Sequence, residues 1–162
     1  MEQIKETLQE LKENGFEGFV KVGELKRDYR NREIPVTSGI YLILYLAAGH
    51  PQFIYPGTGG FFKGKDPNVS IERLNSKWVA NEAVIYIGKA NDLNSRLRQY
   101  MRFGCKENVG HYGGRYIWQI ADADELVVCW KEFEEAREKE KEMISCFKEK
   151  HNGMFPFANL VG

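Results

Sequence analysis

The chain has 162 residues, which is the length of one ordinary domain and too short for two domains that each bury a substantial core. Its composition of 43% hydrophobic, 13% aromatic and 28% charged residues is typical of a globular protein and excludes an intrinsically disordered one. Lysine and arginine together number 23, as do aspartate and glutamate, so the formal net charge is zero and the total charge alone attracts neither nucleic acid nor an anionic membrane.

The charge is nevertheless divided along the chain. Residues 86–118 include six basic and two acidic side chains, a net charge of +4, whereas residues 122–142 include four basic and nine acidic side chains, a net charge of −5. A locally basic segment can bind phosphate even when the whole chain is neutral. The zero total therefore does not exclude a nucleic-acid partner.

The N-terminal segment predicts a helix. Residues 2–14 place Ile4, Leu8 and Leu11 at helical spacing with charges elsewhere, and Gly15 ends the pattern. Residues 16–38 mix apolar and charged side chains and predict a short packed elaboration.

The rest of the chain predicts three strands and two longer helices. Apolar runs rich in β-branched and aromatic residues begin at Gly39 and span residues 83–88, and a third strand is predicted over 125–133. One helix is predicted from a cap at Asn91 or Asp92 to the residue before Gly104, and the other over residues 134–150.

The fold class that follows is α/β of the α+β kind, with a small, mainly antiparallel three-stranded sheet flanked by helices. We expect a single domain over residues 1–162, in which 1–38 is an N-terminal helical extension. Residues 49–82 are rich in glycine and proline and form an insertion between the first two strands, with a short helix near residues 71–79.

The N-terminal residues are charged and unlike a secretory signal peptide, and the longest strongly apolar run, residues 39–48, is too short for a membrane span. We therefore expect no membrane partner. The three cysteines share no C-x-x-C spacing, which favours buried free thiols in a cytoplasmic protein, and no zinc-site spacing is present. The oligomeric state is left open.

A glycine-rich stretch in the insertion matches the start of a phosphate-binding loop. Residues 59–65 read GGFFKGK, but Asp66 stands where Ser or Thr would hold magnesium, and Pro67 falls within the helix that should follow. We therefore favour a surface loop in which Lys63 and Lys65 contact a large anionic ligand. The aromatic residues of the insertion either stack on nucleic acid or close one side of the core.

The two apolar runs carry the tripeptides Gly39-Ile40-Tyr41 and Tyr86-Ile87-Gly88, and the chain here resembles the GIY-YIG nuclease family. The motif residues that follow in the family's order are Lys89, Arg96, Tyr100, Pro156 and Asn159. The resemblance covers residues 39–48 and 83–162. It departs from the family in the 44 residues that separate the two motif tyrosines, where members commonly have a short link.

Helix periodicity selects the glutamate that the resemblance requires. Glu140 lies three and four residues before Met143 and Ile144, so it shares their inward face, whereas Glu138 and Glu142 are displaced from that face. A single inward carboxylate suits Mg²⁺ or Mn²⁺, which would also bind phosphate oxygens and water.

The resemblance implies a metal-dependent endonuclease that hydrolyses phosphodiester bonds, with DNA as the expected partner and RNA as an open alternative. Glu140 would hold the metal, and Arg96 and Lys89 would bind phosphate. Tyr41 or Tyr86 would position or deprotonate the attacking water. Further candidates for substrate binding are His111, Lys63, Lys65 and Arg115.

Two roles in this scheme are supporting ones. Tyr100 would orient a neighbouring side chain, and Asn159 would support the site by hydrogen bonding. The alternative to an active nuclease is a catalytically inactive GIY-YIG-like module that binds nucleic acid or protein. On that interpretation each tyrosine is a core residue and Arg96 pairs with an internal carboxylate.

Overall fold

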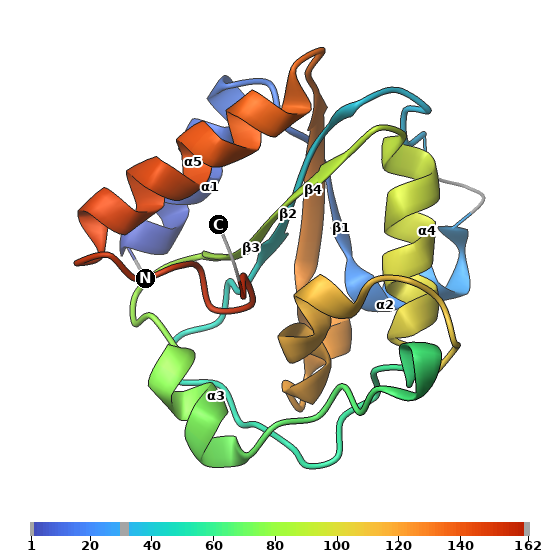
Figure 1. Cartoon of the computed structure of the whole chain (residues 1–162). Coiled ribbons are helices and arrows are strands. Elements are labelled where there is room, and N and C mark those ends of the chain that lie inside the picture. Colours follow the sequence, from blue (N-terminus) through green and yellow to red (C-terminus); the bar gives the residue numbers. More distant parts are fainter. Residues whose placement is uncertain (1, 30–32, 161–162) are drawn as a thin grey trace.

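The computed structural model describes residues 2–29 and 33–160 and shows an α+β arrangement around one antiparallel sheet (Figure 1). The strands are β1 (Glu17–Lys21), β2 (Gly39–Leu44), β3 (Val84–Ala90) and β4 (Val127–Glu132). The α-helices are α1 (Glu2–Glu13), α2 (Val22–Arg27), α3 (Ile71–Lys77), α4 (Leu93–Phe103) and α5 (Ala136–Lys150). The 3₁₀ segments that lie wholly within the described residues include η2 (Phe62–Gly64), η3 (Tyr112–Gln119) and η4 (Ala123–Glu125). Residues 1, 30–32 and 161–162 of the predicted domain lie outside the described residues.

The prediction of three strands is wrong, because the N-terminal extension supplies a fourth. The order in the sheet is β1-β4-β2-β3, with β1 paired antiparallel to β4. β1 is short, its register shifts between Gly18 and Val20, and no alternating apolar pattern marks it in the sequence. Gly18 has φ +96°, and a Cβ there would lie 2.5 Å from the Trp130 ring, so this close crossing requires glycine.

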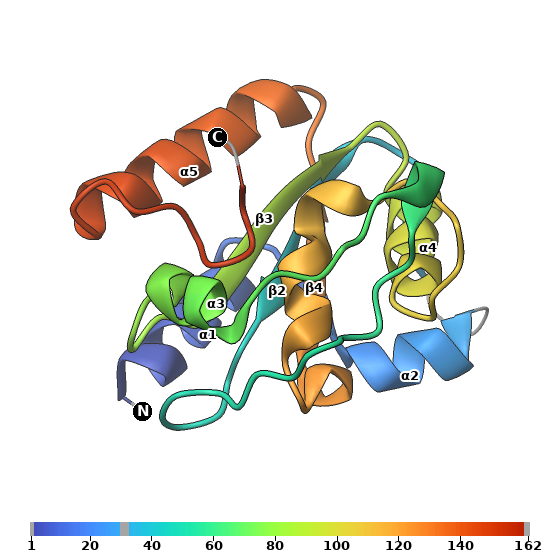
Figure 2. The same ribbon diagram turned by 60° about the horizontal axis from the view of Figure 1, so that its bottom comes forward.

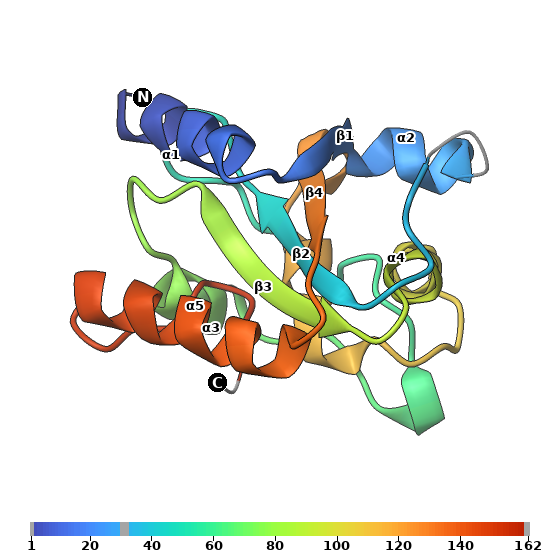
Figure 3. The same cartoon turned by 90° about the horizontal axis from the view of Figure 1, so that it is seen from above.

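The central strand β2 divides its side chains between two hydrophobic layers. Tyr41 and Ile43 face the layer that contains α4 and η3, whereas Ile40, Leu42 and Leu44 face the layer that contains α1 and α5. Figure 3 shows α1 and α5 on one face of the sheet and α4 on the other. All six residues of β2 are buried, because this strand is covered on both faces.

The two long helices after β3 begin and pack as their sequences indicate. Asp92 caps α4, since its carboxylate accepts a hydrogen bond from the Ser95 N–H at 3.0 Å. Leu97 and Met101 are buried on the inner face of α4. α5 buries Ile144 and Phe147, which places the inner face of this charged helix against the sheet.

The insertion folds back across the molecule beside η3 (Figure 2). Phe53 forms an isolated β-bridge with Ile120, and the Thr58 N–H donates to the Trp118 carbonyl at 3.0 Å. The Gln119 side chain, which is 1% exposed, donates to the carbonyl of Val69 at 2.9 Å and accepts from its N–H at 2.8 Å. These bonds attach the insertion to the layer that contains α4.

The expected burial of the thiols is correct only for Cys129, which lies on β4. Cys105, which follows the end of α4, and Cys146, which lies on α5 and lines a hollow between α5 and α1, are both exposed. No helix within residues 2–29 and 33–160 has both the length and the apolar character of a membrane span.

Candidate active site

Three tyrosines and one histidine from four segments form a buried aromatic cluster. Tyr41 comes from β2, Tyr86 from β3, Tyr100 from α4, and His111 from the loop before η3. The Tyr41 ring centroid lies 5.9 Å from that of Tyr86 and 6.2 Å from that of Tyr100. The pairing of β2 with β3 and the packing of α4 on the sheet thus bring together all three tyrosines that the sequence selects.

His111, a further candidate for substrate binding, lies inside this buried cluster. The imidazole is 0% exposed and stacks on the Tyr100 ring, with centroids 3.5 Å apart and an interplanar angle of 6°. Its Nε2 lies 2.6 Å from the Tyr41 hydroxyl, while its Nδ1 is buried without a hydrogen-bond partner among the described residues. Burial and the positive charge of Arg96 hold the pKa of His111 well below its ordinary value, so the ring is neutral.

Arg96 brings a positive charge to the edge of the cluster. Its guanidinium is partly buried and donates from Nη1 to the Gly110 carbonyl at 2.6 Å and to the Gln99 Oε1 at 3.0 Å. Its charge acts to lower the pKa values of Tyr41 and Tyr86, although it does not outweigh burial. The guanidinium therefore lies within electrostatic range of both motif phenols.

The three phenols differ in their access to solvent. Burial raises the pKa of each one, so all three are neutral at physiological pH. Tyr41 and Tyr100 are 0% exposed, whereas Tyr86 is 8% exposed on the edge strand. The Tyr100 hydroxyl donates a hydrogen bond to the Gly114 carbonyl at 2.6 Å, so it is already engaged within the protein. Tyr86 is consequently the phenol best placed to meet a bound molecule.

The glycine of the second tripeptide has a packing role that the sequence did not reveal. Gly88 pairs with Tyr41 across β2 and β3, and a Cβ at this position would lie 2.3 Å from the Tyr41 Cζ. Only glycine therefore lets the Tyr41 ring cross the neighbouring strand at this point. This role depends on the pairing of Gly88 with Tyr41 across the two strands, which cannot be deduced from a single sequence.

Glu140 and Lys89 meet at the other side of the same edge strand. The Lys89 Nζ lies 3.6 Å from the Glu140 Oε1, and the Glu140 side chain is 18% exposed. Glu140 acts to raise the pKa of Tyr86, which places its carboxylate within electrostatic range of that phenol. β3 thus separates Glu140 from the aromatic cluster, while Tyr86 lies within range of both.

The chemistry of this donor set is compatible with a hard divalent cation. Among the described residues, no group of three or more His, Cys, Asp or Glu side chains forms a multidentate metal centre. A single carboxylate fits Mg²⁺ or Mn²⁺ in a site where water and phosphate oxygens complete the coordination. Glu140 is the residue that would hold such an ion, and its present partner is Lys89.

Asn159 supports the edge strand from the C-terminal segment. Its Oδ1 accepts from the Ile87 N–H and its Nδ2 donates to the Ile87 carbonyl, both at 2.9 Å. The preceding Ala158 N–H donates to the Ile85 carbonyl at 2.8 Å. Because these bonds flank Tyr86, the C-terminal segment fixes the backbone that carries this phenol.

The remaining candidates, Lys63, Lys65 and Arg115, lie outside the aromatic cluster. The two lysines belong to the η2 region of the insertion, and Arg115 belongs to η3. Phe62 connects the insertion to the cluster, because its ring lies against Gly110, whose carbonyl binds Arg96. These three cations thus lie beside the site and not within it.

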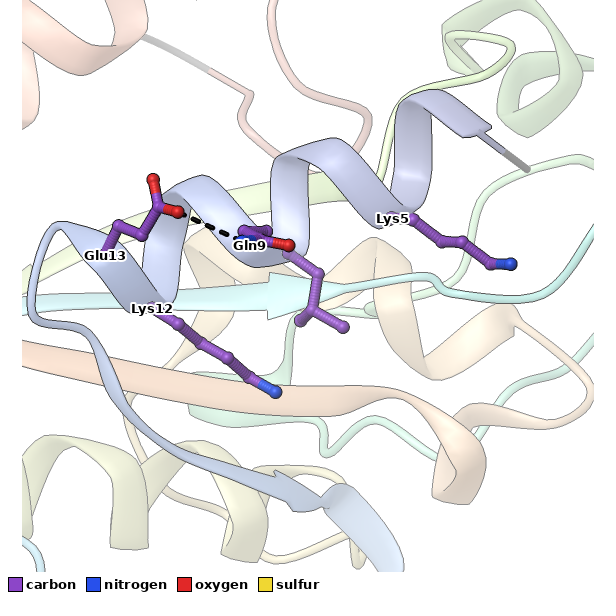
Figure 4. Close-up of a pocket in the computed structure, with 5 residues that line it drawn as sticks. Lys5, Gln9, Lys12 and Glu13 are labelled. Carbon is purple, nitrogen blue, oxygen red and sulfur yellow. Dashed lines mark hydrogen bonds between the residues drawn. The ribbon is translucent and has the colours of Figure 1, made fainter.

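A separate hollow lies on the outer side of α1. It is lined by Lys5, Leu8, Gln9, Lys12 and Glu13 (Figure 4). The Gln9 amide donates to the Glu13 carboxylate at 3.1 Å across one helical turn. Because α1 covers the face of the sheet opposite Tyr41, this hollow is unrelated to the aromatic cluster.

Comparisons with models of protein families, with curated proteins and with solved structures find no match. The interpretation of the site therefore depends on its own geometry and on the motif residues.

Proposed function

We propose that this protein is a divalent-metal-dependent endonuclease that hydrolyses phosphodiester bonds in DNA. The observation that carries the proposal is the position of Tyr86. This phenol lies on an edge strand, within electrostatic range of the Arg96 guanidinium in one layer and of the Glu140 carboxylate in the other. A cation, a carboxylate and a phenol at one edge are the groups that phosphodiester hydrolysis uses.

Each side chain has a role that follows from its position. Arg96 would bind a non-bridging oxygen of the scissile phosphate, because its guanidinium has five donors and the two named acceptors leave others available. Tyr86 would orient the attacking water through its hydroxyl, and it would accept a proton from that water only as the tyrosinate, after its own proton has passed to solvent. Lys89 would move from Glu140 to the phosphate as substrate binds, which frees the carboxylate.

The metal would bind to Glu140 and stabilise the negative charge that develops on the phosphate and on the leaving oxygen. The other residues of the aromatic cluster would influence the pKa and the position of the Tyr86 phenol from within the protein. Tyr41 acts to lower the pKa of Tyr86 against the larger effect of burial, and the neutral His111 holds the Tyr41 hydroxyl. Tyr100 and Asn159 would fix the ring stack and the edge strand, respectively.

A second candidate is a catalytically inactive module that binds nucleic acid or protein. The observation that favours it is that both charged groups already have partners within the protein. Arg96 binds the Gly110 carbonyl, and Glu140 is ion-paired with Lys89. In an inactive module, the contacts of Arg96 with Gly110 and of Glu140 with Lys89 would serve only to stabilise the fold.

Nicking of supercoiled DNA with Mg²⁺ or Mn²⁺ distinguishes the two candidates. We expect the wild-type protein to nick the DNA and the Arg96→Ala and Glu140→Gln variants to lose about a hundred-fold or more in rate. Arg98→Ala and Glu138→Gln are matched controls, because both side chains are exposed on the same two helices. Nicking that persists in both site variants would refute the proposed site, and DNA binding without cleavage under every metal condition would support the inactive module.

A further inference from the structure

A basic and aromatic surface lies next to the candidate active site, where the insertion meets the start of η3. We call it the insertion surface, and its members are Phe61, Lys63, Lys65, Tyr112 and Arg115. It has two features that the fold itself does not require, an exposed phenylalanine and a group of cations without acidic partners among the described residues.

The two adjacent phenylalanines of the insertion have opposite environments. Phe62 turns toward the protein and lies against Gly110, whereas Phe61 is 52% exposed. Stacking the flat face of Phe61 on another ring would remove this apolar surface from water. The exposed ring beside cations is therefore suited to a ligand that has both flat aromatic groups and negative charge.

Cation–π contacts hold the cations of the surface in place. The Lys63 Nζ lies 5.2 Å from the Phe62 ring centroid, and the Tyr112 centroid is 5.6 Å from the Lys65 Nζ and 4.0 Å from the Arg115 Cζ. None of the ion pairs found between described residues includes any of these three cations.

The one carboxylate within this stretch of the insertion is engaged locally. Asp66 Oδ1 accepts from the Asn68 N–H at 2.9 Å and from its Nδ2 at 2.8 Å. The lysines that precede Asp66 in the sequence therefore keep their charge available for an anionic ligand.

The insertion surface also contacts the loop that contains Gly110, the residue whose carbonyl accepts a hydrogen bond from Arg96. The Lys63 N–H donates to the Asn108 Oδ1 at 3.2 Å, and the Tyr112 hydroxyl donates to the Asp66 carbonyl at 2.9 Å. The Gly110 carbonyl between these two contacts accepts the hydrogen bond from Arg96. The hydrogen-bond partner of Arg96 and the contacts of the insertion surface thus lie within one short loop, residues 108–112.

We propose that the insertion surface binds an unpaired stretch of the DNA substrate, with a base stacked on Phe61 and backbone phosphates on the three cations. The inference rests on the proposed function, because it assumes DNA at Arg96. Unpaired DNA is favoured over duplex because the faces of paired bases are already covered by their neighbours, whereas an unpaired base can stack on an aromatic side chain. The preferred substrate is then a duplex with a single-stranded tail.

Binding measured in EDTA tests this proposal without cleavage. Fluorescence anisotropy would compare labelled oligothymidylate, a blunt duplex, and the same duplex with an oligothymidylate tail. We expect the tailed duplex to bind more tightly than the blunt one, and Phe61→Ala to weaken binding of the tailed and single-stranded DNA by about 5- to 150-fold, the equivalent of one base stack removed. Binding of the blunt duplex should be unchanged by this substitution.

The cations are tested by the dependence of affinity on salt. The double variant Lys63→Ala/Lys65→Ala should reduce the slope of log K against log salt concentration by about 0.7 for each phosphate that the variant no longer binds. The double variant Lys5→Ala/Lys12→Ala on α1 (Figure 4) is the matched control. Lys12 also lies over an aromatic ring, because its Nζ is 5.2 Å from the Phe19 ring centroid. This control should keep the wild-type slope.

Equal affinity for blunt and tailed duplex, or unchanged binding of tailed DNA by Phe61→Ala, would overturn the inference. Absence of DNA binding would overturn it as well. Cleavage with no preference for a tail would leave the proposed function intact and remove this inference alone. Tail-dependent binding by a protein that never cleaves DNA would support the inference and refute the proposed function.

Discussion

The strongest structural prediction concerns the Asn159 amide, which forms a two-hydrogen-bond bridge to the edge strand. Asn159 is 6% exposed and Ile87 is 2% exposed, so the bridge is shielded from water. Asn159→Ala removes both hydrogen bonds and leaves a buried N–H and a buried carbonyl on Ile87 without partners. An unsatisfied buried backbone group costs about 1–3 kcal/mol, so the two together cost about 2–6 kcal/mol.

The expected loss lies in the lower half of this range, about 2–3 kcal/mol, because β3 is an edge strand and water can enter the space that the amide leaves. This is a large part of the total stability of a typical domain, which is roughly 5–15 kcal/mol. Equilibrium unfolding in urea measures the free energy directly. Hydrogen exchange at the Ile87 amide should accelerate in the same variant.

Two further variants make the test specific. Asn14→Ala replaces an exposed asparagine after α1 and should change the free energy of unfolding by less than about 0.5 kcal/mol. Asn159→Asp keeps the acceptor but places a carboxylate against the Ile87 carbonyl, so its stability relative to wild type should improve as the pH falls and the carboxyl becomes a donor. A loss in Asn159→Ala no larger than that in Asn14→Ala would refute the account of the bridge.

Two other predictions test the aromatic cluster. Gly88→Ala should destabilise the protein by about 1–3 kcal/mol, because its Cβ would overlap the Tyr41 ring, whereas Gly113→Ala, which has no atom within 4 Å, should not; thermal unfolding compares them. His111 has a folded-state pKa below its unfolded value, so the unfolded chain binds the proton more readily. Stability should therefore fall as the pH drops below about 6.5, and His111→Phe should weaken this dependence in urea unfolding at each pH. An unchanged pH dependence in the variant would contradict the buried neutral imidazole.

Local sequence patterns were sufficient to predict most of the elements. Helical spacing of apolar residues identified α1, α4 and α5, and the cap at Asp92 placed the start of α4. Apolar runs identified β2, β3 and β4, because those strands are largely buried and need a continuous hydrophobic segment. β1 gave no such signal, since its residues are exposed or only partly buried at the edge beside β4.

The residues of the candidate site also fall into those that the sequence selects and those that only the structure places. The motif spacing selects Tyr41, Tyr86 and Arg96, and helix periodicity selects Glu140, because both are properties of the amino-acid sequence alone. Only the tertiary structure showed that His111 lies beneath the surface against Tyr41, because a loop residue is positioned by its packing and not by a repeating pattern.

The sequence by itself therefore selected the side chains of the proposed phosphodiesterase site and predicted the elements that carry them. Only the tertiary structure decided that Tyr86 is the least buried of the three tyrosines, and that the edge strand β3 separates Glu140 from the aromatic cluster. It also decided that the insertion folds back beside η3, since the hydrogen bonds between Val69 and Gln119 join residues about fifty positions apart. Residue type and spacing are local properties, whereas exposure and convergence depend on which strands pair and which faces they cover.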